Sequence, residues 1–281
     1  AENHCHRIYA GRERVNTNEV TITTWQSVYQ LDRKFFEEYD VVIGDEAHLF
    51  KSKSLIGIMD KLHHAKYRYG FTGTLDGSQT HKWVLEGLFG PSYKVTQTKK
   101  LQDEGHLASL DIQCLVLKYK PKKFDTYEDE IQFLIGHEKR NNFITNLVKD
   151  LDGNSLVLYS RVEAHGAILF DLINKKVSED RKVFFIHGGV DAEDREQVRE
   201  ITEKEKDAII VASYGTFSTG INIKNLHNVI FASPSKSRVR NLQSIGRVLR
   251  KGKDKVSAKL YDIADDLTIG SRKNYTLNHF I

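Results

Sequence analysis

Cysteine and proline are scarce in this sequence, and long apolar runs are absent. The chain has two cysteines, Cys5 and Cys114, and three prolines among 281 residues. Two cysteines this far apart argue against a disulfide framework and favour a reducing, intracellular compartment. No apolar run approaches the ~20 residues that a membrane-spanning helix needs, and no secretory signal pattern opens the chain. These patterns exclude the disulfide-rich secreted class and the helical membrane class.

The chain also lacks an initiator methionine, because it opens at Ala1 and its one methionine is Met59. We therefore expect it to begin inside a larger protein. The cluster His4-Cys5-His6 has metal-ligating residue types, but no second ligand pair follows at zinc-finger spacing, so we expect no metal there. The net charge of +4 and the pI near 8.8 are compatible with a polyanionic partner without requiring one.

The bulk composition is that of a soluble globular protein, with 40% hydrophobic and 28% charged residues. A length of 281 residues predicts two domains. Residues 94–108 are polar and rich in Lys, Gln and Asp, which is typical of a segment that connects two domains. The expected domains are therefore 1–108 and 109–281.

Short apolar runs alternate with helical patterns, most regularly in the second half. There the expected strands are 156–159, 183–186, 208–212, 229–232 and 260–263, and the expected helices are 127–151 (long or broken), 162–174, 192–204 and 238–249. This alternation predicts βαβ units and a mostly parallel sheet. In the first half we expect strands at 20–24, 41–44 and 67–71 and helices at 25–39 and 55–64.

Two adjacent carboxylates directly follow the apolar run that ends at Gly44. Asp45 and Glu46, in Asp45-Glu46-Ala47-His48, would lie at the carboxyl end of a buried parallel strand, where open α/β sheets bind ligands. One such carboxylate can hold Mg²⁺ on a nucleotide, usually through water, and the next can orient or deprotonate an attacking water. Taken alone, the four residues are explained equally well by a solvated acidic turn.

A second candidate site lies in the segment from Gln243 to Arg250. The three-residue spacing of Arg247 and Arg250 on a predicted helix places both guanidiniums on one face, with Gln243 one turn earlier. Two rigid, permanent cations suit the charge that develops on a transferring phosphoryl group. An ordinary basic helix face is the alternative interpretation.

These motifs, in this order and at these separations, resemble those of the superfamily 2 helicases. Thr23-Thr24-Trp25-Gln26-Ser27 resembles motif Ib, Thr72-Gly73-Thr74 motif III, 156–161 motif IV and 210–222 motif V. The residues of these motifs, and the segment Gly105-His106-Leu107-Ala108, are similar to those of the phage recombination helicases within this superfamily. The resemblance covers nearly the whole chain. It implies the α/β class, with two RecA-like parallel-sheet domains that face each other across a cleft, the first one incomplete.

The resemblance also assigns roles in a split ATP site. It implies that Asp45 holds the Mg²⁺ of ATP, that Glu46 activates the hydrolytic water and that His48 couples this site to the second domain. Thr72, Gly73 and Thr74 would link hydrolysis to domain movement. For His48 and Thr72 the alternatives are a structural histidine and a hydroxyl-capped turn. The expected ATP site comprises Asp45, Glu46, His48, Gly220, Asn222, the nucleotide sensor Gln243 and the arginine fingers Arg247 and Arg250.

Nucleic-acid contacts are expected from loops at the carboxyl edges of strands. Hydroxyls, amides and backbone N–H groups bond phosphate oxygens and carry no base information, so they suit a reader that ignores sequence. Each candidate taken singly is better explained as a loop residue than as a contact. The candidates are Thr24, Gln26, Ser160, Arg161, Ser213 and Thr216.

One element of the superfamily is missing from these residues, namely the phosphate-cradling loop G-x-x-x-x-G-K-[ST]. Gly252-Lys253 is followed by Asp254 and comes after the arginines. In the family order the loop precedes motif Ib, so we expect it upstream of Ala1. Residues 1–281 alone are then not expected to hydrolyse ATP. A degenerate, non-hydrolysing relative is the alternative.

The resemblance implies an ATP-dependent DNA helicase or translocase that acts on Holliday junctions, forks and R-loops in recombination and fork rescue. Its cofactors would be ATP and Mg²⁺. It would bind branched or single-stranded DNA through the phosphate backbone, and RNA in R-loops, as a monomer in the cytoplasm of the host cell and without a membrane partner. An RNA helicase of the DEAH type and a non-catalytic nucleic-acid-binding or annealing module are the alternatives.

Overall fold

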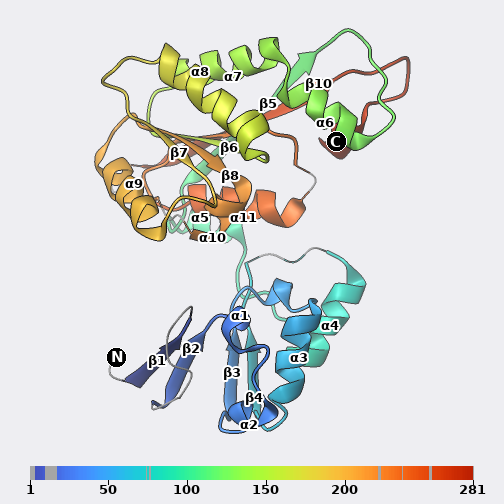
Figure 1. Ribbon diagram of the computed structural model, residues 1–281, viewed down its shortest axis with the longest axis vertical. Coiled ribbons are helices and arrows are strands. Elements are labelled where there is room, and N and C mark those ends of the chain that lie inside the picture. Colours follow the sequence, from blue (N-terminus) through green and yellow to red (C-terminus); the bar gives the residue numbers. More distant parts are fainter. Residues whose placement is uncertain are drawn as a thin grey trace. The chain divides into compact units, whose positions relative to one another are not determined.

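The chain divides into two compact units, unit 1 (Ala1–Val95) and unit 2 (Thr96–Ile281) (Figure 1). The computed structural model describes residues 4–9, 18–73, 75, 77–220, 223–235, 237–252 and 255–280. The expected boundary after residue 108 needs correction, because residues 96–108 belong to unit 2. The amide of Ala108 donates to the carbonyl of Leu249 at 2.8 Å.

Unit 2 is built on a six-stranded parallel sheet with the strand order β5-β10-β9-β6-β8-β7. The strands are β5 (Ser109–Lys118), β6 (Ser155–Tyr159), β7 (Val183–Ile186), β8 (Ile209–Ser213), β9 (Asn228–Phe231) and β10 (Ser257–Asp266). The helices are α5 (Thr98–Asp103), α6 (Tyr127–Ile135), α7 (Glu138–Asp150), the π-helical turn η3 (Val162–Ala167), α8 (Ile168–Lys176), α9 (Ala192–Lys204), α10 (Tyr214–Gly220), α11 (Arg238–Val248) and α12 (Tyr275–Phe280). The predicted α/β class with a parallel sheet is confirmed.

The central strands of unit 2 are buried on both faces, which explains their apolar sequences. Because side chains alternate along a strand, Leu156 and Leu158 of β6 enter one core cluster while Val157 and Tyr159 enter the other. Helices α9, α10 and α11 cover the first face, and α7 and α8 cover the second (Figure 1). Both faces of the sheet are therefore sealed by helices of the same unit.

Two local expectations for unit 2 change. The expected loop after β8 is helix α10, and Tyr214 and Phe217 of this helix are buried in the core. The pattern at 127–151 resolves into α6 and α7, which are separated by Gly136 and His137. The His137 side chain accepts the amide of Arg140 at 3.3 Å and so caps the start of α7.

Unit 1 contains two separate pairs of parallel strands among its described residues, β1 with β2 and β3 with β4. The strands are β1 (Cys5–Ile8), β2 (Val20–Thr23), β3 (Val41–Gly44) and β4 (Tyr67–Gly70), and the helices are α1 (Trp25–Val28), α2 (Arg33–Phe36), the 3₁₀ turn η2 (Ala47–Leu49), α3 (Lys53–Lys61) and α4 (Gln79–Phe89). The expected helix 25–39 is corrected to α1 and α2. The chain is extended at Asp32 (φ −66°, ψ 157°), so a new helix begins there.

One face of the β3–β4 pair is left open within unit 1. Val42 packs against the core formed by α3, α4 and their neighbours, whereas Val41 and Ile43 are 49% and 66% exposed. Their partners across the pair, Tyr67 and Tyr69, are 56% and 49% exposed. Apolar side chains on this face gain little burial from the described residues.

Candidate functional site

The backbone brings the acidic segment and the Thr72 segment to one edge of the β3–β4 pair. The parallel ladder continues past both strands, since the Phe71 amide donates to the Gly44 carbonyl and the Ala47 amide to the Phe71 carbonyl, each at 2.8 Å. Asp45 and Thr72 therefore follow neighbouring strands at the same carboxyl edge. The sequence prediction that these strand ends carry the site residues is consistent with this geometry.

A chain of polar contacts links Glu46, His48 and Thr72. His48 Nδ1 lies 3.2 Å from Glu46 Oε2 and 3.0 Å from Thr72 Oγ1. The His48 side chain is buried, whereas Glu46 is half-exposed and the Asp45 carboxylate is exposed. Histidine thus holds one carboxylate and one hydroxyl from two different motifs. Gly73 is exposed next to this chain, and Thr74 lies outside the described residues.

Glu46 has a backbone conformation that non-glycine residues seldom adopt. Its φ and ψ are both 48°, and it is the one non-glycine residue with positive φ in the described part of the chain. Its amide donates to Asp45 Oδ1 at 2.8 Å, which compensates part of the cost of this turn. Such conformations cost about 1–3 kcal/mol and concentrate at functional sites. The turn directs the carboxylates of two successive residues to one sheet edge.

Two glycines let an aromatic pair support this turn from beneath. A Cβ on Gly44 would lie 2.8 Å from the Phe50 ring, and one on Gly70 would lie 2.9 Å from the Phe89 ring. The two rings pack edge to face with centroids 5.0 Å apart. Phe50 directly follows η2 and Phe89 ends α4, so the position of the acids depends on how both elements pack on the strand ends.

Thr24 and Gln26 lie at the carboxyl end of β2 and the start of α1. Both side chains are exposed. Thr24 Oγ1 lies 2.9 Å from Ser27 Oγ, and the Thr24 amide donates to the Ile8 carbonyl at 3.4 Å. The hydroxyl is thus part of a local helix-start contact, as in the loop interpretation, and it remains accessible.

The unit 2 candidates gather at neighbouring strand ends. In the sheet Tyr159 pairs with Ser213, so Ser160 and Arg161 lie beside the β8–α10 junction. Ser213 Oγ lies 2.8 Å from Thr216 Oγ1 and accepts the Thr216 amide at 3.2 Å. Ser160 and Arg161 are exposed, but Thr216 is only 6% exposed, so its hydroxyl works mainly within this turn.

Arg161 is already engaged by a carboxylate in this structure. Its guanidinium forms an ion pair with Glu128 of α6, and both side chains are about half-exposed. An exposed pair of this kind contributes about 0–1 kcal/mol and exchanges readily with other anions. Glu128 therefore stands where a phosphate would bind Arg161 and competes with it.

A buried polar network, which the sequence did not reveal, supports the Ser160 loop. His165 Nδ1 lies 2.8 Å from Ser233 Oγ, and Ser233 Oγ accepts the Ser160 amide at 3.1 Å. His165 Nε2 lies 3.2 Å from Asn141 Oδ1. Burial, with a smaller contribution from the charge of Arg140, lowers the pKa of His165 to about 3. The imidazole is therefore neutral and accepts the Ser233 hydroxyl.

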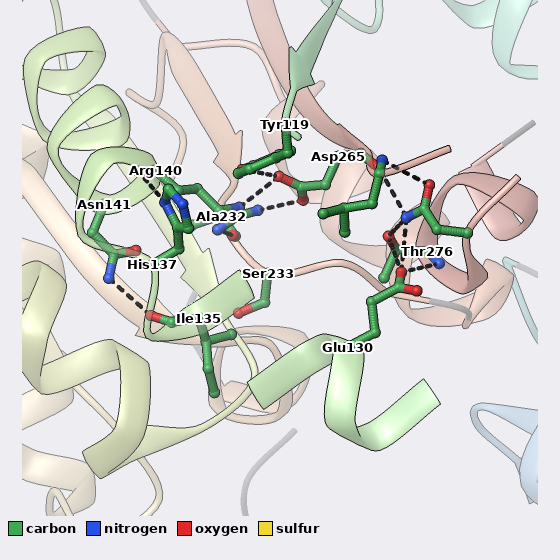
Figure 2. A network of polar contacts seen from close by, with 12 residues as sticks. Tyr119, Glu130, Ile135, His137, Arg140, Asn141, Ala232, Ser233, Asp265 and Thr276 are labelled. Atoms are coloured by element: carbon green, nitrogen blue, oxygen red, sulfur yellow. Dashed lines mark hydrogen bonds and ion pairs between the residues drawn. The ribbon is translucent and has the colours of Figure 1, made fainter. Parts of the chain in front are cut away.

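A charged pair lies at the centre of the same network (Figure 2). Arg140 donates to both carboxylate oxygens of Asp265, at 2.8 and 3.0 Å, and to the Ala232 carbonyl at 2.8 Å. Tyr119 donates to Asp265 at 2.6 Å. Both charged side chains are fully buried, and burial and Asp265 raise the pKa of Tyr119. A charged residue in an otherwise apolar helical pattern was the available sequence signal for Arg140.

The two arginines of the second motif do not share a helix. Arg247 lies in the last turn of α11, which ends at Val248, whereas Arg250 lies past the helix and bridges to Leu107. Past the end of the helix the buried Lys255 ammonium donates to the carbonyls of Val248, Arg250 (3.1 Å) and Lys224 (3.3 Å). The expected common helix face is therefore corrected.

Three further expectations concern the same region. Gln243, Arg247 and Arg250 are all half-buried, and Gln243 is one turn before Arg247 as expected. Gly220 is the last residue of α10, and Asn222 lies outside the described residues. Burial lowers the pKa of Lys255 to about 8. Through its bonds to the carbonyls of Lys224 and Arg250, Lys255 joins the chain after α10 to the end of the arginine segment.

The described ranges of the chain contain neither a metal-binding group nor a membrane-spanning helix. Across the ranges that the structure describes, no three His, Cys, Asp or Glu side chains gather into a metal-binding group. Within the same ranges no helix combines the length and apolar character needed to cross a bilayer. Cys5 and Cys114 are both free thiols.

Two parts of the chain match models of known protein families. Residues 1–77 match the model of the type III restriction enzyme res subunit. Residues 138–252 match the model of the helicase conserved C-terminal domain. The second match contains the Ser160 loop, the β8–α10 junction and the arginine segment.

Individual relatives agree with these models. The ATP-dependent DNA helicase UvsW of enterobacteria phage T4 is 35% identical over 95% of this chain and 54% of its own length. Its crystal structure superposes with a TM-score of 0.53 over 99% of this chain and 58% of that one. A mimivirus protein named as an ATP-dependent RNA helicase is 24% identical over 83% of this chain and 44% of its own.

A more distant structure confirms the fold alone. A fragment named as the HsdR subunit of a type I restriction enzyme from Vibrio vulnificus superposes with a TM-score of 0.72 at 19% identity, over 93% of this chain and 50% of that one. The chain spans about half the length of the sequence relatives described above.

Proposed function

The chain belongs to the superfamily 2 helicases, and on this premise we propose that the whole protein is an ATP-dependent DNA helicase or translocase. Its proposed substrates are branched DNA molecules, namely Holliday junctions, replication forks and R-loops. Its proposed roles are recombination and fork rescue. The observation that carries the proposal is the chain of contacts from Glu46 through His48 to Thr72 at one sheet edge. The name of the phage T4 relative supports DNA as the polymer.

The residues at this edge fit a magnesium nucleotide. Mg²⁺ keeps several waters and is usually bound through one or two carboxylates together with substrate phosphates. The exposed carboxylate of Asp45 suits that mode, with contact through water. The bound ion would neutralise phosphate charge. Glu46, oriented by its contact with His48, is placed by this proposal as the group that orients and deprotonates the hydrolytic water.

The coupling role is assigned to Thr72 and its neighbours. Thr72 shares His48 with the general base, so a change at Glu46 can reach Thr72 through the His48 ring. In this proposal Gly73 and Thr74 belong to the same coupling segment. Gln243, Arg247 and Arg250 act on the same nucleotide, with the guanidiniums stabilising charge on the γ-phosphate. Gly220 and Asn222 complete the proposed nucleotide set.

The nucleic acid would be held through its phosphates. Ser160, Arg161 and Ser213 lie on adjacent strand ends of unit 2, and Thr24 and Gln26 are exposed at a strand end of unit 1. Backbone amides and hydroxyls there suit phosphate oxygens. Arg161 would exchange Glu128 for phosphate, and Thr216 would act by shaping the Ser213 turn.

The decisive experiment is Glu46→Gln in the whole protein, with Glu37→Gln as the control. Both changes remove one negative charge from a side chain of unit 1 that is at least partly exposed. Loss of a general base should reduce the ATPase rate about 10²- to 10⁴-fold and abolish strand displacement on a branched DNA. The control should retain both activities. Strand displacement that survives Glu46→Gln would refute the enzymatic assignment.

A second experiment concerns residues 1–281 alone. Because these residues carry no G-x-x-x-x-G-K-[ST] loop, we propose that they do not hydrolyse ATP by themselves. Purified 1–281 should show no phosphate release above background with or without DNA. Turnover stimulated by nucleic acid would contradict this proposal.

An RNA helicase is the second candidate, and the name of the mimivirus relative favours it. Comparing the stimulation of ATPase activity by DNA and by RNA in the whole protein separates the two. A non-catalytic annealing module is the third candidate, and strand annealing without ATPase activity would favour it. We further propose that the protein acts as a monomer in the cytoplasm of the host cell.

A further inference from the structure

An open groove in unit 2 lies beside the end of β5, away from the loops assigned above. Its volume is about 810 Å³, which falls within the range of roughly 300–1,000 Å³ typical of ligand sites. The walls come from the chain that leaves β5 (residues 116–122) and from α6 and α7. No part of the proposed ATP or helicase machinery lines it.

Lysines surround this groove. Lys118, Lys120 and Lys122 alternate with Tyr119 and Pro121 as the chain leaves β5, and all of them line it. Lys139 adds a fourth ammonium from α7, while Glu138 is the one acidic side chain of the lining. Arg140 also lines the groove, but its charge is neutralised by Asp265, and both side chains are fully buried. The accessible charge of the groove is therefore strongly positive.

Aromatic rings supply the rest of its surface. Tyr119, Phe133 and His137 pack against one another with centroid distances between 5.1 and 6.4 Å. The Lys122 ammonium lies 4.2 Å from the Phe133 centroid, which fixes this lysine over the wall. Phe143 lines the groove from α7 and is 36% exposed. An apolar ring is thus presented to solvent among cations.

We propose that this groove binds single-stranded nucleic acid, with phosphates on Lys118, Lys120 and Lys139 and a base against Phe143. Single strands combine a dense row of negative charges with exposed π faces, and proteins bind them with basic grooves and aromatic platforms. An acidic polypeptide satisfies the lysines but has no planar group for the ring. The groove would bind without regard to sequence.

The groove extends the proposed nucleic-acid surface without depending on it. All six strands are parallel, so the ends of β5 and β6 lie on the same edge of the sheet. Two strands, β10 and β9, separate them, which at a strand spacing of about 4.8 Å amounts to about 14 Å. A strand held by Ser160 and Arg161 can continue along this edge into the groove.

The test measures binding of a fluorescein-labelled 20-nucleotide thymidine strand to residues 1–281, without ATP, across a salt series. The groove variant is K118Q/K120Q/K139Q, which keeps Lys122 because that lysine packs on Phe133. Loss of three phosphate contacts should reduce the slope of log K against log salt by about 2 and affinity at least tenfold. The control variant K175Q/K176Q/K206Q removes the same charge from exposed positions elsewhere in unit 2, and we expect less than about a twofold change.

A second pair of variants isolates the aromatic contact. Phe143→Ala should weaken binding about five- to tenfold without changing the salt slope, because stacking is not electrostatic. Phe143→Trp should retain or increase affinity. Circular dichroism on every variant excludes a folding defect, and binding of poly-glutamate of equal length serves as the polyanion comparison.

Three results would overturn the groove. The first is an equal change in affinity for the groove variant and the charge control. The second is an unchanged affinity in Phe143→Ala. The third is poly-glutamate that binds as tightly as the oligonucleotide and loses as much affinity as the oligonucleotide does in the groove variant. Failure of the proposed function is distinguishable, because Arg161→Gln tests the motif loop separately. Binding lost in Arg161→Gln but retained in the groove variant would support the motif loop and reject the groove.

Discussion

The parallel strands of the two units are buried to different extents. In unit 2 every residue of β6 and β9 is buried, and helices of the same unit cover both faces. In unit 1 only one face of the β3–β4 pair is covered by the described residues. On the other face the side chains are about half-exposed or more, namely those of Val41, Ile43, Tyr67 and Tyr69. The proposed catalytic acids therefore lie on the unit whose strands are less completely buried. From this difference we expect unit 2 to fold by itself and unit 1 not to do so.

The largest expected effect is a difference in autonomous folding. Residues 96–281 expressed alone should unfold in urea in one cooperative transition, with a free energy in the ordinary range of about 5–15 kcal/mol. Residues 1–95 alone should show no sharp transition and should bind a hydrophobic dye, because their open face stays exposed. A cooperative transition for 1–95 would remove the contrast between the units.

The second prediction concerns the ion pair at the centre of unit 2. Arg140→Met leaves Asp265 buried without its partner and should lower the free energy of unfolding by about 3–5 kcal/mol. Lys182→Met breaks the pair with Glu205, in which both side chains are at least one-third exposed, and should cost about 0–1 kcal/mol. Urea unfolding followed by circular dichroism measures both. Equal effects would show that burial does not separate the two pairs.

The third prediction examines the support of the acidic turn in unit 1. Gly70→Ala forces a Cβ to within 3 Å of the Phe89 ring and should cost about 1–3 kcal/mol. Gly57→Ala, in the middle of α3 with nothing within 4 Å, should instead stabilise unit 1 by about 0.5–1 kcal/mol. The only two tryptophans, Trp25 and Trp83, both lie in unit 1, so their fluorescence reports this unit selectively. Opposite signs are the expected outcome, and equal signs would contradict the close-packing argument.

The last prediction is a pH dependence in unit 2. The pKa of His165 is about 3 in the folded state and near 6.5 when unfolded, so only the unfolded chain takes up this proton as the pH falls below about 6.5. Stability should then decrease by at most about 1.4 kcal/mol per pH unit between pH 6.5 and 4.5. His165→Gln should remove this slope.

Comparing the two proteins isolates the His165 contribution. Burial raises the pKa of Asp262 to about 6, which gives a slope of the opposite sign over part of the same range. That contribution is common to wild type and variant, so it cancels in the difference between their urea midpoints. Parallel stability curves for the two proteins would show that His165 is not neutral in the folded state.

Local patterns were sufficient for the strands and for the strand ends that carry polar residues. The apolar runs at 41–44 and 156–159 predict buried parallel strands. Both strands form and their carboxyl ends carry the polar residues as strand direction requires, but β6 is fully buried whereas β3 has two exposed side chains. The expected helix 238–249 agrees with α11 to within one residue, but the placement of Arg250 on that helix was wrong. Lys255 binds the carbonyl of Arg250 and also that of Lys224, which is far from Arg250 in the sequence, so a local pattern does not predict this contact.

By itself the sequence determined the α/β class, the order of the motifs and which residue types reach a sheet edge, because hydrophobic periodicity and short-range spacing encode these features. Only the tertiary structure decided that His48 joins Glu46 to Thr72, that Glu128 occupies Arg161 and that lysines and rings converge beside β5. Those contacts join residues that are distant in the chain or in different motifs. Their geometry follows from packing and burial, which a linear pattern does not specify.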